Sequence, residues 1–318
     1  MNSDDLASLP VTEQENPKTT TLSSSSTDEI LRLMNDEDAL VAAAVREVLP
    51  TVAQAVDGIV SRIEAGGKLF YVGTGTSGRL GVLDASEIPP TFGVSRDMIQ
   101  AVIAGGYDAC HRAVEASEDD ATAGREDLKA RGFAQGDALV GIAASGGTPY
   151  TAGALAYARE LGAFTVAITC VPDSLITKTA EVSIVPVVGP EVLTGSTRLK
   201  AGTAQKLVLN MLSTATMTKL GYVSGNRMTN VNAGNKKLRA RASRILMAET
   251  GLDKDGAARA LDEAGGDLRV ALVMSATKCD SAKAKQALAT SRGVVKKAVE
   301  ELINNSPTSN VQSPKSKD

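Results

Sequence analysis

Short apolar segments, each ending in a turn rich in glycine or proline, recur between residues 69 and 190 of the chain. Stretches with helical patterning, such as the alanine-rich residues 151–161, separate them. The apolar segments are Leu69–Val72, Met98–Ala104, Asp137–Ala144, Phe164–Cys170 and Val182–Val188. Continuously apolar strands that alternate with helices are typical of a parallel sheet covered by helices on both faces. We therefore predict an α/β fold, a three-layer α/β/α sandwich around a central parallel sheet.

Apolar residues at helical spacing precede this alternating region. They are Val41, Val45, Val48, Val52, Val56, Ile59 and Ile63. Pro50 interrupts the pattern and should kink or divide the helix, because proline lacks a backbone N–H. Thr27, followed by two acidic residues, predicts the start of an earlier helix through Met34, and Asn35–Asp38 has the composition of a second cap. At least two N-terminal helices are expected.

The two ends of the chain differ in texture from the α/β region. We assign residues 1–27, rich in Ser and Thr, to an N-terminal tail, and 28–225 to the α/β domain with its N-terminal helices. Residues 226–303 are a helical region with three short helical segments near 255–263, 266–275 and 282–290, which predict a small three-helix bundle. The polar residues 304–318 are expected to be a disordered tail.

Composition excludes several classes of function. The 318 residues carry a formal charge of -3 and include no Trp, 1 His and 3 Cys. Few aromatic side chains and near-neutral charge argue against nucleic-acid binding. The basic stretch Val231–Glu249 could be read as a nucleic-acid contact, but a solvated helix face is favoured. Multi-histidine metal sites, zinc ribbons and disulfide frameworks need residues that the chain lacks.

The chain shows no sign of a membrane partner. No apolar run approaches the roughly 20 residues of a membrane span. The start of the chain is acidic and polar, unlike a secretory signal. We therefore expect a cytoplasmic protein, and the composition indicates that it uses no metal.

Two glycine-rich loops have the composition of phosphate sites. Gly75, Thr76, Ser77 and Gly78 follow a predicted strand and open a helix, where free backbone N–H groups and the helix dipole attract anions. Dinucleotide binding is an alternative, but no clear acidic residue ends a second strand about 20 residues later. The loop is no Walker motif, since no Lys follows the glycine.

The second loop repeats this pattern after another strand. It comprises Ser145, Gly146, Gly147 and Thr148. Two such loops at the carboxyl ends of parallel strands indicate a ligand site, and their hydroxyls suit a phosphomonoester on a small sugar. A third polar segment, 191–206, carries Ser196 and Lys200 ahead of a predicted buried helix, and helix capping explains it equally well.

The order of these segments resembles a known family. Two of the loops are similar to those of the sugar isomerase (SIS) domain, a phosphosugar-binding sandwich. Residues 75–93 read Gly-Thr-Ser-Gly-Arg-Leu-Gly-Val-Leu-Asp-Ala-Ser-Glu-Ile-Pro-Pro-Thr-Phe-Gly. This segment, with matching ones at 12–17, 104–106, 113–119, 141–146, 148–150 and 194–206, resembles the N-acetylmuramic acid 6-phosphate etherases over roughly residues 12–300. The C-terminal bundle resembles a ubiquitin-associated (UBA) domain.

The resemblance implies a carbon–oxygen lyase of cell-wall amino-sugar recycling. Such an enzyme removes D-lactate from C3 of N-acetylmuramic acid 6-phosphate and adds water, leaving N-acetylglucosamine 6-phosphate. By motif, the catalytic carboxylates are Glu87 and Glu118, with Glu115 and Asp119 as rivals for the second place. We expect Glu118 to act at the C2 proton and Glu87 at the lactate oxygen. The resemblance also implies that the reaction needs no cofactor and that the chain forms a homodimer.

The chain departs from the family's sequence pattern at two places, and two functions other than the etherase stay open. Gly147 stands where such chains usually carry Arg, so a phosphate or carboxylate contact there is lost or comes from another base such as Lys200. The Ser-rich residues 22–26 replace a more regular segment. A non-catalytic phosphosugar sensor of the glucokinase regulatory protein type shares the fold but need not keep both carboxylates. An aldose–ketose isomerase also needs a base at C2, but the string Asp84–Pro90 argues against it.

Overall fold

A computed structural model describes residues 9–114, 118–231, 233 and 235–304. The described residues form two compact units. The first combines residues from 1–88 and 95–216, and the second combines 89–94 with residues from 217–318. The predicted tails extend beyond the described residues, at 1–8 and 305–318.

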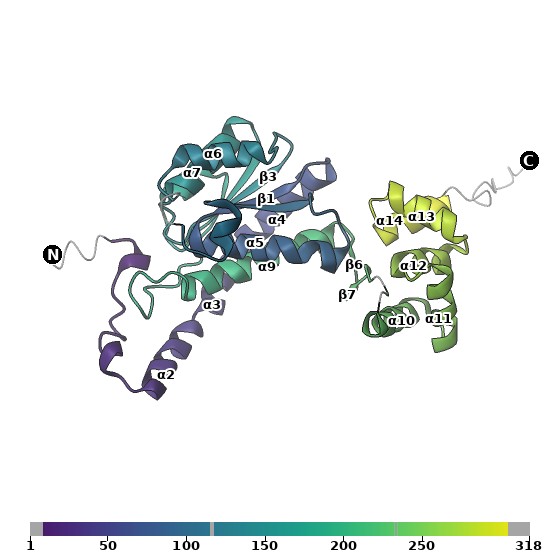
Figure 1. The fold of residues 1–318 in the computed structure, drawn as a ribbon, viewed down its shortest axis with the longest axis horizontal. Coiled ribbons are helices and arrows are strands. Elements are labelled where there is room, and N and C mark those ends of the chain that lie inside the picture. The colour runs from purple at the N-terminus through teal and green to yellow at the C-terminus, as the bar shows by residue number, and fades with distance from the viewer. Residues whose placement is uncertain (1–8, 115–117, 232, 234, 305–318) are drawn as a thin grey trace, which may run out of the picture. The chain divides into compact units, whose positions relative to one another are not determined.

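A five-stranded, fully parallel sheet organises the first unit (Figure 1). Its strands are β1 (Leu69–Gly73), β2 (Ile99–Ile103), β3 (Ala138–Ile142), β4 (Phe164–Ile168) and β5 (Val182–Ile184). They lie side by side in the order β2-β1-β3-β4-β5. Each falls within a predicted apolar segment or one residue beyond it, so the predicted parallel sheet is confirmed.

Helices cover both faces of this sheet, as predicted. The helices that accompany the sheet along the chain are α2 (Thr27–Asp38), α3 (Val41–Glu47), α4 (Leu49–Glu64), α5 (Gly75–Phe92), α6 (Ala121–Ala130), α7 (Pro149–Glu160), α8 (Leu175–Thr179) and α9 (Lys200–Lys219), with short 3-10 turns at η1 (Val11–Glu13), η2 (Leu22–Ser24) and η3 (Gly106–Cys110). In Figure 1, α6 and α7 lie on one side of the strands and α4, α5 and α9 on the other. The arrangement is the expected three-layer sandwich.

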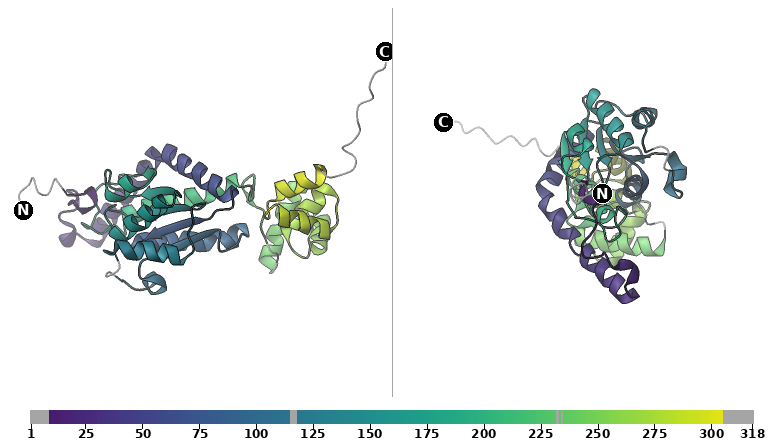
Figure 2. Two further views of the ribbon diagram at one scale, coloured as in Figure 1. Left: turned by 90° about the horizontal axis from the view of Figure 1, so that it is seen from above. Right: turned by 90° about the vertical axis from the view of Figure 1, so that its left-hand side faces the viewer.

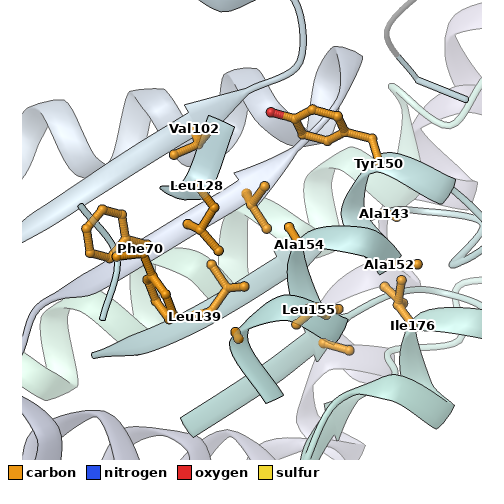
Figure 3. Packing of buried hydrophobic residues seen from close by; sticks show 14 of the residues in the cluster. Phe70, Val102, Leu128, Leu139, Ala143, Tyr150, Ala152, Ala154, Leu155 and Ile176 are labelled. Atoms are coloured by element: carbon orange, nitrogen blue, oxygen red, sulfur yellow. The ribbon is translucent and has the colours of Figure 1, made fainter. Parts of the chain in front are cut away.

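Alternating side chains along the strands supply the two cores. Phe70, Leu139 and Leu155 lie in the cluster beneath α6 and α7, where Phe70 meets Phe133 edge to face (Figure 3). On the opposite face, α5 approaches β1 so closely that a Cβ at Gly81 would lie 3.1 Å from that of Tyr71. Both faces of the sheet are therefore dry, which explains the absence of polar alternation along the strands.

The N-terminal helices confirm one local prediction and correct another. Pro50 is at the start of α4, so the helical pattern divides there as expected. The cap of α2 is Ser26, one residue before the predicted Thr27, and it forms a capping box with Glu29. The cluster Asn35–Asp38 continues α2 and caps nothing, so its interpretation as a second helix start was wrong.

Residues 10–26 pack against the first unit although their composition is typical of a tail. Thr12, Asn16 and Thr19 are buried. The Asn16 amide donates to the carbonyl of Pro190, and the Thr19 hydroxyl donates to the carbonyl of Val192. This segment therefore lies along the chain that leads into α9.

The second unit is a helical bundle preceded by a short antiparallel ribbon (Figure 2). Its elements are β6 (Val223–Ser224), β7 (Arg227–Met228), α10 (Lys236–Thr250), α11 (Lys254–Glu263), α12 (Leu268–Thr277), α13 (Ser281–Thr290) and α14 (Val295–Asn304). The three predicted helical segments are α11, α12 and α13, each capped by an Asp side chain. Helix α14 was not predicted and joins the same core. The likeness to a UBA domain stays a prediction.

None of the described helices alone is long and apolar enough to cross a membrane. Only the bent combination of Thr27–Glu47 and Leu49–Glu64 satisfies the length and composition criteria, and only when its parts are taken together.

Candidate functional site

The order of the strands locates the site. The chain leaves β1 through α5 to reach β2 on one side, whereas β3 pairs with β1 on the other. In open α/β sheets, ligands bind at the carboxyl ends of the strands where the winding direction reverses. Gly73 at the end of β1 pairs with Ile142 at the end of β3, and the two glycine-rich loops begin there. The fold thus brings both loops to one edge of the sheet.

The first loop forms the N-terminus of α5. The Gly78 N–H donates to the Thr74 carbonyl, so the amides of Gly75, Thr76 and Ser77 precede the first hydrogen bond of the helix. A side chain at Gly78 would not fit, because its Cβ would lie 2.6 Å from the carbonyl oxygen of Gly73. The amides gather at the positive end of an 18-residue helix. This geometry suits an oxyanion.

The second loop begins with one constrained glycine and one open glycine. Gly146 has φ +69°, and a Cβ there would lie 2.1 Å from Ser174 Oγ. Gly147 is exposed and has an ordinary φ, with Ser145 Oγ the nearest atom, 3.9 Å from where its Cβ would be. The Ser145 hydroxyl accepts from the Gly147 N–H, whereas the Thr148 side chain does not cap α7. The Thr148 hydroxyl can therefore face a ligand.

Glu118 joins the two loops. Its backbone carbonyl accepts from the Tyr150 N–H in the first turn of α7, at 3.1 Å. Its carboxylate lies at the first loop, with Oε1 3.3 Å from where a Cβ of Gly75 would be. Gly75 itself has φ +48°, a left-handed conformation that favours glycine. One carboxylate thus stands half-buried between two anion-shaped loops. The rival Asp119 is exposed, and Glu115 lies outside the described residues.

Glu87 lies elsewhere on the first unit. It is exposed on α5, twelve residues after Gly75. At about 1.5 Å per residue, its backbone is roughly 18 Å along the helix from the loop that Glu118 touches. Leu83, one turn earlier, is 54% exposed although it is apolar. Within one chain, the two predicted catalytic carboxylates do not meet.

The third segment reaches the first loop through α9. A Cβ at Gly202 would lie 3.5 Å from both Thr76 Cγ2 and the Thr197 carbonyl oxygen. One turn further along α9, Gln205 Oε1 accepts from the Ser77 hydroxyl at 3.0 Å. Ser196, half-buried, lies in the turn before Thr197, where its N–H donates to the Leu193 carbonyl.

Lys200 has a structural partner. Its ammonium is 1% exposed and donates to Glu37 Oε2 at 2.6 Å, while Lys18 binds the other oxygen of Glu37 at 2.9 Å. Burial alone would raise the pKa of Glu37, but the hydrogen bonds from Lys200 and Lys18 outweigh it and lower that pKa to about 2. In this arrangement Lys200 ties α2 to α9, and its predicted contact with substrate stays a prediction.

Two buried acids were not singled out from the sequence. Glu191 accepts from the N–H groups of Lys200 and Ala201 and so caps α9, and burial raises its pKa. Asp84 accepts from Tyr71, Asn210 and Ser213, and burial likewise raises its pKa.

Among 37 acidic residues, apolar neighbours at helical spacing could have marked Asp84 on α5 as buried, whereas Glu191 lies outside any helix and carries no such signal. No three His, Cys, Asp or Glu side chains form a metal-binding group within the described part of the chain.

The chain is similar to known proteins over most of its length. Residues 51–159 match the model of the glucokinase regulatory protein N-terminal SIS domain. Over 289 residues the chain is 52% identical to the N-acetylmuramic acid 6-phosphate etherase of Brucella anthropi, covering 91% of this chain and 94% of that protein. Over 293 residues it is 49% identical to the enzyme of that name from Clostridium beijerinckii, covering 92% and 96%.

A solved structure of a phosphoheptose isomerase from Francisella tularensis is 19% identical, with a TM-score of 0.46, and covers 61% of this chain and 99% of that one. The identity to the etherases extends over nearly the full length of both chains. The chain therefore belongs to the N-acetylmuramic acid 6-phosphate etherase family.

Proposed function

We propose that this chain cleaves the D-lactyl ether at C3 of N-acetylmuramic acid 6-phosphate, giving N-acetylglucosamine 6-phosphate and D-lactate. Its relatives of 49–52% identity carry the name of that activity. The observation that supports the proposal best is the Glu118 carboxylate beside Gly75, at the edge where both anion-shaped loops begin. A phosphosugar whose phosphate is held by the loops would present its carbon skeleton to that acid.

The proposed chemistry is elimination followed by addition of water. Ring opening makes C1 an aldehyde, which acidifies the proton on C2. Glu118 takes that proton, a double bond forms between C2 and C3, and the C3–O bond breaks as Glu87 protonates the departing lactate oxygen. Water then adds its hydroxyl to C3 and a proton to C2, with the same two carboxylates in reversed roles. Positioned carboxyl groups can carry these steps without a cofactor.

The phosphate would be held by neutral donors. The first loop supplies three backbone amides and two hydroxyls at the α5 N-terminus, and the second supplies further donors at the start of α7. The proposed contacts are Gly75, Thr76, Ser77, Gly78, Ser145, Gly146, Gly147, Thr148, Ser196 and Lys200.

We further propose that the working form is a homodimer in the cytoplasm. Acid and base must each come within about 3 Å of neighbouring atoms of one sugar. The separation of Glu87 from the Glu118 edge, roughly 18 Å along α5, prevents this within one chain. A second copy whose α5 faces the edge would bring its Glu87 to the substrate. The exposed Leu83 beside Glu87 fits such a contact.

Release of D-lactate from N-acetylmuramic acid 6-phosphate tests the function directly. A D-lactate dehydrogenase couples the release to NADH formation. We expect turnover by the natural chain and a loss of at least about 100-fold in Glu118→Gln and in Glu87→Gln, the range for a general acid or base. A chain that binds the sugar phosphate and releases no lactate is not an etherase.

That second outcome would support a phosphosugar sensor. The match of residues 51–159 to the glucokinase regulatory protein domain favours it as the alternative function. The presence of both Glu87 and Glu118 supports the enzyme, because a sensor needs neither.

A further inference from the structure

Gln205 is a buried polar side chain with half of its amide unused. It is fully buried on α9, and Oε1 accepts from the Ser77 hydroxyl at 3.0 Å. Among the residues that the structure describes, Nε2 finds no hydrogen-bond acceptor. A buried N–H without a partner is costly and rare in folded proteins. The amide that carries this N–H contacts Ser77 in the first turn of α5, at the proposed phosphate loop.

The direction of the Ser77 proton has a consequence for anion binding. A serine hydroxyl has one proton to donate and two lone pairs that accept. While Ser77 donates to Gln205 Oε1, it can offer only lone pairs to a ligand, and these repel the oxygens of a phosphate. Ser77 is itself buried, with 7% of its surface exposed, so water has little access to make up the difference.

A half-turn of the Gln205 amide exchanges the positions of Oε1 and Nε2, and so changes both the unpartnered N–H and the direction of the Ser77 proton. Nε2 then faces Ser77 Oγ and donates to it, so the orphaned donor gains a partner. The Ser77 proton becomes available to a phosphate oxygen, as a hydrogen bond strengthened by the negative charge. The amide oxygen is left without a donor, which buried carbonyls tolerate better than buried N–H groups do.

We propose that Gln205 is the positioning residue of Ser77: in the complex with a sugar phosphate it donates Nε2–H to Ser77 Oγ and so directs the Ser77 proton at the phosphate. The proposal deepens the proposed function and rests on its phosphate site. Gln205 touches no reacting atom. Its effect therefore falls on binding of the phosphorylated sugar, at a distance from the chemistry at C2 and C3.

A double-mutant cycle on binding tests this role. The variants are Ser77→Ala, Gln205→Met, which keeps the length of the side chain, and the two combined. Titration calorimetry with N-acetylglucosamine 6-phosphate gives the dissociation constant, and substrate turnover gives KM and kcat. We expect each single variant to weaken binding about tenfold, as for loss of a hydrogen bond to a charged group. The double variant should bind no worse than Ser77→Ala, because Gln205 acts through that hydroxyl. The increase should appear in KM with kcat within about twofold.

Two further variants guard against a purely structural effect. Ser213→Ala removes another buried hydrogen bond of α9, to Asp84, and should leave the dissociation constant unchanged. Gln205→Asn keeps the amide but is too short to reach Ser77, so it should weaken binding as Gln205→Met does, even if the latter folds poorly.

The outcomes separate this inference from the proposed function. Losses that multiply in the double variant, or unchanged binding in both Gln205 variants, overturn the positioning role. Unchanged binding in Ser77→Ala overturns it as well, while lactate release by the natural chain would still stand. A chain without lactate release that shows the expected cycle is no etherase but keeps this phosphate site.

Discussion

The two proposed catalytic carboxylates lie in contrasting surroundings. Glu118 is held on both sides: its backbone accepts from the first turn of α7, and its carboxylate reaches the first turn of α5. Glu87 stands on the outer part of α5, exposed, and its side chain makes no hydrogen bond or ion pair among the described residues. Glu118 is therefore part of the carboxyl edge of the sheet, whereas Glu87 is free on the surface of α5 to meet a second molecule.

The difference indicates what a single chain can do. In the proposed mechanism, the edge with Glu118 binds the phosphosugar and Glu118 removes its C2 proton. In the same proposal Glu87 protonates the leaving group, although it lies roughly 18 Å along α5 from the first loop. Each chain would then hold two unlike halves, and two chains related by a twofold axis would complete two sites.

Mixing two inactive variants gives the largest effect expected from this comparison. Glu87→Gln and Glu118→Gln should each be nearly inactive alone. In a mixed dimer, one site receives both natural carboxylates and the other receives neither. Random pairing makes about half of the dimers mixed, so lactate release should return to about a quarter of the natural rate.

Co-expression with two affinity tags isolates the mixed species for this measurement. A sample in which both tags sit on Glu118→Gln chains is the matched control and should stay inactive. Mixed dimers as inactive as either parent would place both carboxylates in one chain's site and refute the shared arrangement.

Glu-to-Gln substitutions at positions 37 and 87 should differ in their effect on the free energy of unfolding. Glu37→Gln leaves the buried ammonium of Lys200 unpaired at the start of α9, which costs about 3–5 kcal/mol. Glu87→Gln, on the exposed face of α5, should stay within about 0.5 kcal/mol of the natural chain. Urea unfolding monitored by circular dichroism measures both. Equal losses would contradict the assignment of Glu37 as the buried partner of Lys200.

Low pH should lower the stability of the fold through the same carboxylate, that of Glu37. The pKa of Glu37 is lowered from 4.5 to about 2 in the folded chain, so the unfolded chain binds the extra proton first. Its contribution to stability is complete above pH 4.5 and is lost as the pH falls towards 2. In a stability profile, Glu37→Gln should lack this component and approach the natural chain at the acid end. A constant gap between the two curves would be inconsistent with the pairing.

The second loop offers the smallest effects and the finest comparison. Gly146→Ala meets Ser174 Oγ and a left-handed φ, so it should cost about 1–3 kcal/mol and weaken sugar-phosphate binding. Gly147→Ala meets open space at an ordinary φ and should change stability by less than about 0.5 kcal/mol. Thermal unfolding of the two variants side by side measures the difference. A larger loss at Gly147 would contradict the described loop.

Local patterns in the sequence were sufficient to predict the sheet. They were much less informative about the contacts at the carboxyl edge of that sheet. Leu69–Val72 and its four counterparts are apolar because both faces are covered, and that pattern is visible residue by residue. The division at Pro50 follows from one missing N–H. Helix α14 went unpredicted, although its apolar face completes the core of the second unit.

Contacts between distant segments were beyond the reach of such patterns. Ser77 and Gln205 are 128 positions apart, and Glu37 and Lys200 are 163 apart. Asn16 and Thr19 are buried although polar because they bind the backbone carbonyls of Pro190 and Val192, and a carbonyl leaves no trace in a sequence. The separation of Glu87 from Glu118 likewise follows from the position of Glu87 on α5, twelve residues after the Gly75 that Glu118 approaches.

Exchange of the C2 proton with solvent tests the central assignment most directly. N-acetylmuramic acid 6-phosphate is incubated in deuterated buffer with each variant, and the C2 signal is followed by NMR. If Glu118 takes the C2 proton and Glu87 serves the leaving lactate, Glu87→Gln continues to exchange the proton while releasing almost no lactate, and Glu118→Gln does neither. Exchange at the natural rate in Glu118→Gln would contradict the account.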